Sequence, residues 1–154
     1  MCIRDSSEGD GNTGCFLPTE WEWEYACRGG YYEKHGMQRR YFWGDKYKAG
    51  VEHAWLYENA GDKARLVMNQ RNAANFGSAE NPNTENGFEL FAMIGNVWEW
   101  CANRYDPKSV SRSLRGSSFA NGNASSARCS YRLRSDPALA DQNGGFRVAR
   151  ARKS

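Results

Sequence analysis

Glu99 stands out in this sequence because it is a carboxylate placed between two large aromatic residues. It lies in Gly95-Asn96-Val97-Trp98-Glu99-Trp100-Cys101, where a Gly-Asn turn leads into a run typical of a β-strand. Side chains alternate along a strand, so Trp98 and Trp100 are expected on one face and Val97 and Glu99 on the other. Two indoles need a large core, whereas the carboxylate needs a cation, water or an arginine, of which the candidates are Arg115, Arg132 and Arg147.

Five cysteines are the other residues that could carry chemistry, and their spacing excludes some of it. They are Cys2, Cys15, Cys27, Cys101 and Cys129. No two of them form the Cys-x-x-Cys pair of structural zinc sites, and their odd number does not suit a fully paired disulfide framework. One disulfide among Cys27, Cys101 and Cys129 stays open, because sequence alone fixes neither the pairing nor the cellular compartment.

The composition indicates one folded domain with an aromatic core. Leu, Ile, Val and Phe account for only 21 of the 154 residues, but there are 6 Trp, 8 Tyr and 16 Gly, which favours a core of rings and many turns. The net charge of +3 is too small to indicate a nucleic-acid-binding protein. No apolar run approaches the ~20 residues of a membrane-spanning helix. We therefore expect no nucleic-acid partner and no membrane span.

Local patterns predict one clear helix and one clear strand. Residues 19–28 are expected to be helical, because Thr19 and Glu22 have the spacing of a capping box and Gly29-Gly30 follows. Residues 114–119 are expected to form a strand that enters a turn.

The remaining segments set the expected domain boundaries. Residues 144–150 are expected to form a final strand, and residues 69–87, rich in Asn, Ala, Gly and Ser, a long loop. The domain is expected to span 15–150. It would lie between a disordered or non-native lead-in at 1–14 and a basic tail at 151–154.

Five short segments occur together in an order that one protein family shares. They are Leu17-Pro18-Thr19-Glu20 with Glu24-Tyr25-Ala26, then Trp43-Gly44-Asp45, Gly95 to Trp100, Leu114-Arg115-Gly116, and Gly145-Phe146-Arg147-Val148. Over roughly residues 15–150 the chain resembles the sulfatase-modifying-factor domain of formylglycine-generating enzymes. The resemblance implies an α+β, C-type-lectin-like fold with little regular secondary structure. The family domain usually has a further region before its Leu-Pro-Thr-Glu motif, so the resemblance also suggests an N-terminal truncation.

The family's oxidase chemistry depends on cysteines that are missing at the matching positions. In formylglycine-generating enzymes two cysteines handle copper and oxygen just after a Gly-Ser-aromatic segment, which here is Gly116-Ser117-Ser118-Phe119. Residues 120–126 contain no cysteine, and neither Asn nor Ser replaces a thiolate as a ligand for Cu(I). The resemblance therefore predicts neither a copper site nor catalytic residues here. Copper-dependent oxidation of a sulfatase cysteine to formylglycine, by this chain or as a subunit, is kept as an alternative.

The resemblance also implies a calcium site at the Gly95 turn. In the family this turn binds Ca²⁺, and the matching donors are the backbone carbonyls of Gly95 and Val97 and the carboxylate of Glu99. Such a mixture of oxygen ligands suits Ca²⁺. The sequence departs from the family at Ala92, where an Asp or Asn ligand is usual. The alternative is that Glu99 pairs with an arginine or caps backbone amides.

The segment 119–143 is the expected ligand-binding surface. Variable proteins of diversity-generating retroelements resemble the same family, and their variable positions lie between the Gly-Ser-aromatic segment and the last strand. The matching candidates here are Phe119, Asn121, Asn123, Ser125, Tyr131, Leu133, Ser135, Asp136, Asp141 and Asn143. Loops on a rigid scaffold make good binding surfaces, so we expect a protein, peptide or glycan ligand. The scaffold is expected to be held by Trp98, Trp100 and Phe146.

Overall fold

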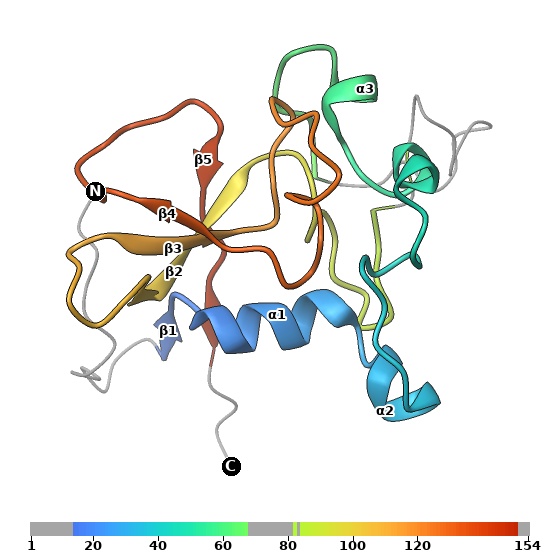
Figure 1. Ribbon diagram of the computed structural model, residues 1–154, viewed down its shortest axis with the longest axis horizontal. Coiled ribbons are helices and arrows are strands. Elements are labelled where there is room, and N and C mark those ends of the chain that lie inside the picture. Colours follow the sequence, from blue (N-terminus) through green and yellow to red (C-terminus); the bar gives the residue numbers. More distant parts are fainter. Residues whose placement is uncertain (1–13, 68–81, 83, 151–154) are drawn as a thin grey trace.

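The structure is a computed structural model that describes residues 14–67, 82 and 84–150. Short helices and a small twisted sheet are joined by long irregular segments (Figure 1), which confirms the predicted α+β fold with little regular secondary structure. Within these described ranges, no helix is long and apolar enough to cross a membrane. The predicted tail at 151–154, the predicted lead-in except Gly14, and residues 69–81 and 83 of the predicted long loop lie outside the described residues.

The predicted N-terminal helix is present as α1, Glu20–Arg28. The side chain of Thr19 accepts a hydrogen bond from the Glu22 amide at 3.3 Å, and the Glu22 carboxylate accepts one from the Thr19 amide at 2.8 Å. The helix ends at Gly29, whose φ of 62° is left-handed and therefore favours glycine. Both capping signals of the sequence are confirmed.

Three further helices occur in the sequence after α1 and before the first strand of the four-stranded sheet, and sequence patterns did not predict them. They are α2 (Tyr31–His35), the 3₁₀ helix η1 (Tyr47–Glu52) and α3 (Tyr57–Ala60). Each is too short to show a helical repeat of apolar residues. Figure 1 shows α2 just beyond the end of α1 and α3 on the opposite side of the molecule.

The four-stranded sheet has the order β4-β3-β2-β5, and its strands are β2 (Trp98–Arg104), β3 (Arg112–Arg115), β4 (Leu133–Ser135) and β5 (Gly144–Gly145). Strands β2 and β3 form an antiparallel pair in which Glu99 lies opposite Arg115. Strand β5 runs parallel to β2, with Trp98 opposite Gly144. The sheet therefore brings the C-terminal segment alongside the Glu99 strand.

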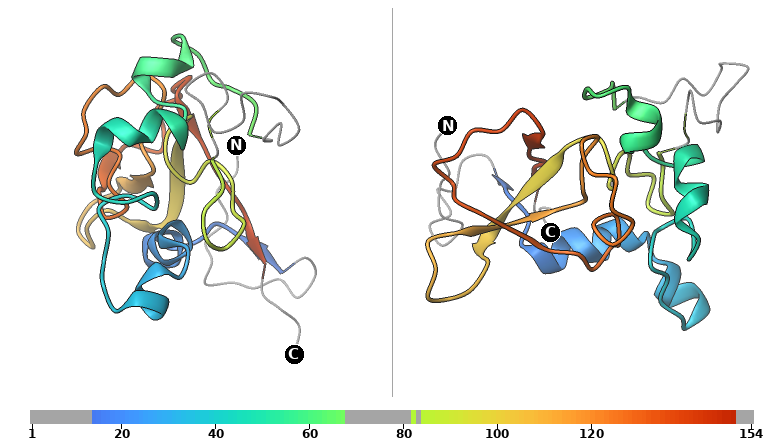
Figure 2. Two further views of the ribbon diagram at one scale, coloured as in Figure 1. Left: turned by 90° about the vertical axis from the view of Figure 1, so that its right-hand side faces the viewer. Right: turned by 45° about the horizontal axis from the view of Figure 1, so that its top comes forward.

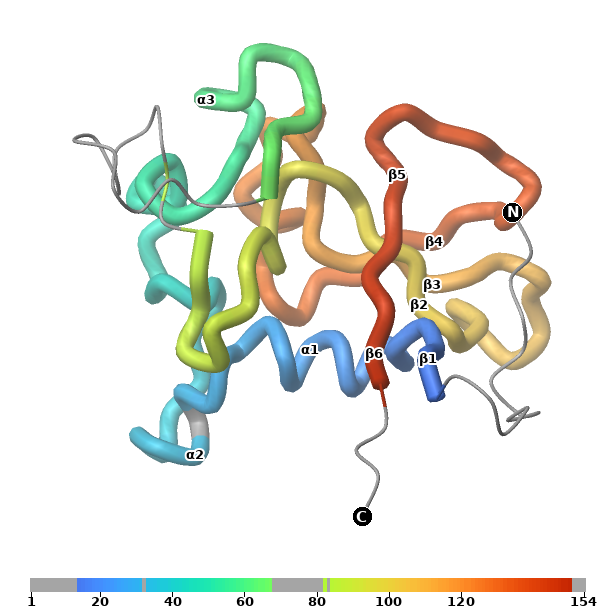
Figure 3. The backbone as a smooth tube through the Cα atoms, turned by 180° about the vertical axis from the view of Figure 1, so that it is seen from behind, coloured from blue at the N-terminus to red at the C-terminus, as the bar shows by residue number. Residues whose placement is uncertain are grey.

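The predicted final strand, residues 144–150, is wrong as a single element. Its first part is β5, while its last part, β6 (Ala149–Arg150), pairs with β1 (Cys15–Phe16) in a separate two-stranded sheet (Figure 3). The two parts pair with different strands, so the chain passes from the four-stranded sheet to the two-stranded sheet between β5 and β6. Phe146 lies in this connecting segment and is 54% exposed, so it does not hold the scaffold as predicted.

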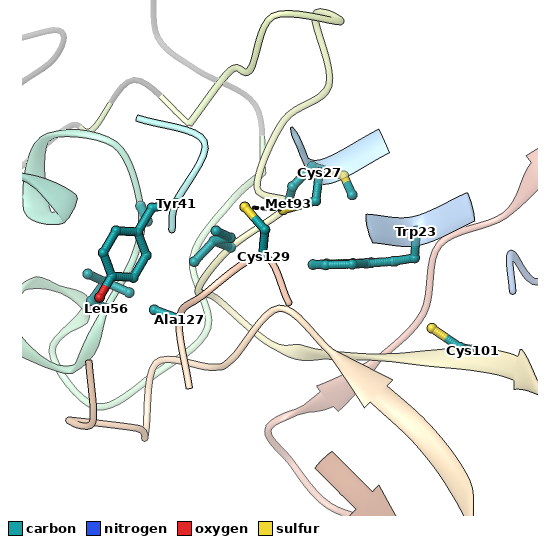
Figure 4. Close-up of a cluster of buried hydrophobic side chains, with 10 residues drawn as sticks. Trp23, Cys27, Tyr41, Leu56, Met93, Cys101, Ala127 and Cys129 are labelled. Atoms are coloured by element: carbon teal, nitrogen blue, oxygen red, sulfur yellow. Dashed lines mark hydrogen bonds between the residues drawn. The ribbon is translucent and has the colours of Figure 1, made fainter. Parts of the chain in front are cut away.

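Helix α1 lies along the sheet (Figure 2), and the main core gathers side chains from α1, from β2 and from the loops between the elements (Figure 4). Its buried members are Trp23, Cys27, Tyr41, Ala54, Leu56, Met93, Ile94, Cys101, Ala127 and Cys129. Cys101 is the β2 residue in this cluster. Trp98 is buried outside the cluster and Trp100 is only half-buried, so the predicted pair of core indoles is wrong in part. An aromatic core is present, but Trp23 from α1 supplies its largest ring.

Candidate functional site

Glu99 is held by an arginine and a tryptophan from opposite ends of the chain. Its Oε1 accepts a hydrogen bond from Arg147 Nη2 at 2.7 Å, and its Oε2 accepts two at 2.6 Å, from Arg147 Nε and Trp23 Nε1. Only 7% of Glu99 is exposed. Burial lowers the pKa of Arg147, but the hydrogen bonds and charge of Glu99 outweigh burial and raise it overall. The result is a buried, charge-assisted pair.

These contacts bear on the calcium prediction for Gly95, Val97 and Glu99. Both oxygens of the Glu99 carboxylate already accept hydrogen bonds from cationic or polar donors, and Ala92 has no side-chain oxygen to add. Gly95 has a φ of 80°, and a Cβ there would lie 2.3 Å from the Trp55 carbonyl oxygen, so the turn itself requires glycine. The oxygen atoms at this turn therefore fit an arginine partner better than a calcium ion. Calcium binding stays a prediction.

The other two candidate arginines serve different glutamates. Arg115 Nη2 lies 2.5 Å from Glu24 Oε2 and also donates to the Cys129 carbonyl at 2.8 Å. Arg132 pairs with Glu20, which is 2% exposed. Three separate Glu–Arg pairs thus tie α1 and β2 to β3 and to the segments next to β4 and β5. The sequence contained a signal that Glu20 and Glu24 need partners, because both share a face of α1 with the apolar Trp23.

Three of the predicted ligand-binding residues converge on Trp98. Its Nε1 donates to Asn121 Oδ1 at 2.8 Å, and its ring lies 6.0 Å from the Tyr131 ring. Its backbone amide donates to the Asn143 carbonyl at 2.7 Å. Trp98 therefore joins three distant parts of the 119–143 segment, as a scaffold residue beneath that surface.

The other predicted residues do not join this group. Phe119 is buried, with 4% exposed, and so contacts the interior. Asn123 Oδ1 accepts hydrogen bonds from the Ser125 amide and hydroxyl, both at 2.9 Å. The remaining ones lie along β4 and the following loop, half-buried or exposed: Leu133, Ser135, Asp136 and Asp141. The segment is thus a series of turns with its own internal hydrogen bonds.

Two exposed aromatic features were missed by sequence reasoning. Tyr57 of α3 is 59% exposed, and a Cβ on Gly122 would lie 3.4 Å from its ring, so it borders the 119–143 surface. Trp21 is 69% exposed and lines a separate hollow of about 280 Å³ along α1, with Tyr25, Glu33 and others. The one-turn helix α3 leaves no helical pattern in the sequence, whereas the i, i+4 spacing of Trp21 and Tyr25 in α1 was a signal that could have indicated a shared exposed face.

Of the cysteines that the structure describes, Cys27, Cys101 and Cys129 are buried, and so none of these three thiols is displayed on the 119–143 surface. Cys15 is exposed. The Sγ atoms of Cys27 and Cys129 are 3.6 Å apart in the core, where Cys27 donates a hydrogen bond to Cys129. Burial raises the pKa of Cys101 to about 12, so it stays a neutral thiol. The segment 120–126 that follows Phe119 has hydroxyl and amide groups in place of thiols.

Comparisons with known proteins agree with this architecture. The family model "Sulfatase-modifying factor enzyme 1-like domain" matches residues 9–152. "Inactive C-alpha-formylglycine-generating enzyme 2" of Mus musculus is 37% identical over 139 residues, which is 86% of this chain and 42% of that protein. "Formylglycine-generating enzyme" of Mus musculus is 32% identical over 151 residues, which is 86% of this chain and 38% of that protein.

A solved structure shares the fold. "Treponema denticola variable protein 1" superposes with a TM-score of 0.68 and is 26% identical, covering 94% of this chain and 53% of that one. The chain thus spans about half the length of that structure and 42% and 38% of the two mouse proteins.

Proposed function

We propose that this chain, which belongs to the sulfatase-modifying factor enzyme 1-like domain family, is a binding module that presents residues 119–143 to a protein, peptide or glycan ligand. In this proposal the chain does not oxidise cysteine. The Glu–Arg pairs and the core around Trp23 serve as the rigid support of the surface.

The observation that carries the proposal is the chemistry of the segment after Phe119. Soft thiolates suit Cu(I), but this segment has Asn121, Asn123 and Ser125. Asn121 is bonded to Trp98, and Cys129, the next cysteine in the chain, is 1% exposed. A peptide substrate on this surface would therefore meet hydrogen-bonding groups rather than a thiol pair.

Exposed side chains on a fixed frame give further support. Asn123, Asp136 and Asp141 are exposed, while the neighbouring β3 and Trp98 are buried. Binding residues are often carried by loops held on a rigid scaffold. A mouse relative described as inactive and a structural neighbour described as a variable protein are both consistent with a role other than catalysis.

A direct test is to screen the chain on peptide and glycan arrays and to compare two variants for each hit. The variant Asn123→Ala/Asp136→Ala/Asp141→Ala should lose binding at least roughly tenfold, since each change removes an exposed polar contact. The variant Trp21→Ala alters an exposed ring on α1 and should bind as the original does. Hits lost only in Trp21→Ala would move the binding site to α1 and contradict the proposal.

Formylglycine formation is the second candidate, and the mouse formylglycine-generating enzyme is the observation that favours it. The copper-loaded chain would be incubated with a cysteine-containing sulfatase peptide and the peptide mass measured. Conversion of cysteine to formylglycine would overturn the binding-module proposal, whereas an unchanged peptide together with array hits would support it. A role as a variable protein is distinguished by sequencing the locus in related genomes, because its substitutions would gather in 119–143.

A further inference from the structure

Arg112 differs from the other arginines that the fold buries or half-buries. Some of those pair with glutamates, namely Arg28, Arg115, Arg132 and Arg147. Others lie over aromatic rings, Arg39 over Tyr31 and Arg65 over Trp55. Arg112 of β3 is half-buried, but within residues 14–67, 82 and 84–150 its guanidinium contacts neither a carboxylate nor a ring. It donates a hydrogen bond to the Ala102 carbonyl. The positive charge of Arg112 is therefore partly desolvated without a counter-charge.

A second arginine lies directly opposite Arg112. Arg104, the last residue of β2, is its partner across the antiparallel pair of β2 and β3. Residues opposite each other have Cβ atoms about 4.5–5.5 Å apart, and like charges placed in this way destabilise a sheet. Arg104 is exposed, and its Nη1 donates one long hydrogen bond, 3.5 Å, to the Pro107 carbonyl. Among the described residues neither arginine has a carboxylate partner, so the sheet holds two like charges side by side at a cost in stability.

Ser135 of β4 continues the same row of side chains. It lies opposite Arg112 across the antiparallel pair of β3 and β4, which are neighbours in the sheet (Figure 1). Opposite side chains share a face, so Arg104, Arg112 and Ser135 line one face of the sheet. This face points away from α1, because Arg115, which alternates with Arg112, pairs with Glu24 of α1. The Ser135 hydroxyl has no hydrogen-bond partner in the described part of the chain.

Positive charge exceeds negative charge around this row. The connection between β2 and β3 adds Lys108, and β4 adds Arg134 from its other face. Two carboxylates are close in sequence, Asp106 and Asp136. Each accepts a hydrogen bond from a backbone amide of its own turn, from Lys108 at 2.8 Å and from Ala138 at 2.9 Å. The excess of cations gives this end of the sheet a field that attracts anions.

We propose that Arg104, Arg112 and Ser135 bind the phosphate group of a phosphate monoester. A guanidinium presents several N–H donors in one plane, which suits two oxygens of a phosphate, and a serine hydroxyl donates to a third. A phosphate monoester carries a charge of about −1.5 to −2 at pH 7, which matches the two arginines and cancels their repulsion. This site does not rest on the proposed function, because both arginines lie outside residues 119–143.

Isothermal titration calorimetry on the full chain at low ionic strength tests the site with inorganic phosphate, a short phosphoserine peptide and glucose 6-phosphate. All three should bind, and the unphosphorylated peptide and glucose should not. Binding should weaken as salt is added, because the charges are partly exposed. A preference of roughly tenfold or more for the peptide or for the sugar phosphate identifies a phosphorylated protein or a small metabolite as the source of the monoester.

Two arginine variants test which residues hold the phosphate. Arg104→Gln and Arg112→Gln should each raise the Kd for phosphate roughly tenfold or more, because each removes charge-assisted hydrogen bonds. The matched control is Arg128→Gln, which removes the same charge from an exposed arginine after the turn at 124–127. It should change the Kd by less than about twofold, since its charge lies outside the row.

Thermal melting separates a binding role of Arg104 from a structural one. Without ligand, Arg104→Gln should melt at the same temperature as the unaltered chain or about 1–3 °C higher, because the repulsion with Arg112 is gone. Phosphate at about ten times its Kd should raise the melting temperature of the unaltered chain by about 3–6 °C, and this rise should be lost in Arg104→Gln. If Arg112→Gln does not fold, Arg104→Gln carries the test alone.

Four results would overturn the proposal. They are no saturable binding of phosphate by the unaltered chain, equal binding of the unphosphorylated probes, an equal loss of affinity in Arg128→Gln and Arg104→Gln, and a fall of more than about 3 °C in the melting temperature of unliganded Arg104→Gln. Ligand binding by residues 119–143 is tested with other variants and stands or falls separately.

Discussion

The layer between α1 and the sheet and the segment 119–143 are both rich in polar side chains, but they use them differently. In the layer, Glu20, Glu24 and Glu99 each pair with an arginine from a distant segment. In the segment, the side chains of Asn123, Asp136 and Asp141 each accept a hydrogen bond from the backbone amide two residues further along the chain.

The difference teaches how burial separates structural charge from displayed polarity. A buried charge without a partner is costly, so long-range pairs in the layer must be intact for the fold. Exposed turn residues lose little when they are changed, because water replaces their partners. Exposed side chains of this kind can therefore change to suit a ligand without loss of the fold. Substitutions in both regions test this contrast.

The largest expected effect is on Arg115, which is 1% exposed and donates to Glu24 and to the carbonyls of Cys129, Ser130 and Tyr131. Arg115→Ala should lower the free energy of unfolding by about 3–5 kcal/mol, because it leaves these partners unpaired in the interior. Urea denaturation measures the change. Arg134→Ala, an exposed arginine on β4, is the control and should change stability by less than about 0.5 kcal/mol. Equal losses of unfolding free energy in Arg115→Ala and Arg134→Ala would show that buried and exposed charges do not differ in this way.

The next effect concerns Glu99 and the calcium prediction. Glu99→Gln should cost about 1.5–3 kcal/mol in urea denaturation, because it removes the charge from hydrogen bonds to Arg147 and Trp23. Millimolar calcium should not raise the melting temperature of the unaltered chain, since Arg147 already neutralises the carboxylate.

Arg147→Met is the informative partner variant for this prediction, because it frees the carboxylate. A calcium-dependent rise in melting temperature should appear there if the oxygen donors of the turn can hold the ion. A rise in the unaltered chain that Glu99→Gln abolishes would show instead that calcium competes successfully with Arg147.

The smallest expected effect is on the displayed segment. Asp136→Ala and Asp141→Ala should each change the free energy of unfolding by less than about 0.5 kcal/mol, because both residues are exposed and accept a hydrogen bond from an amide two residues ahead. Urea denaturation again measures it. Losses above about 2 kcal/mol would place this loop with the structural layer and weaken the binding proposal.

The candidate site was predictable where it depended on local patterns. The capping box at Thr19 and the glycine at the end of α1 give a helix without help from the rest of the chain. The need of Glu99 for a partner also followed from sequence, since a carboxylate between two indoles lies beside a buried face. The five ordered motifs predicted the α+β fold through the family resemblance, and the glycine-rich, aromatic composition agreed with it.

Which partner each side chain meets was decided by the tertiary structure. Arg147 was one of three candidates, and only the parallel pairing of β5 with β2 brings it to Glu99. The split of residues 144–150 between two sheets likewise depends on β1, more than 120 positions earlier in the chain.

The sequence by itself thus determined the capped helix α1, the family and the need of Glu99 for a partner. The tertiary structure decided the pairing of Glu99, the burial of Phe119, and the contact between Cys27 and Cys129. The physical reason is distance along the chain. Helix caps and turns are fixed by neighbours within four residues, whereas a buried ion pair or a thiol contact arises only after segments far apart in sequence have packed together.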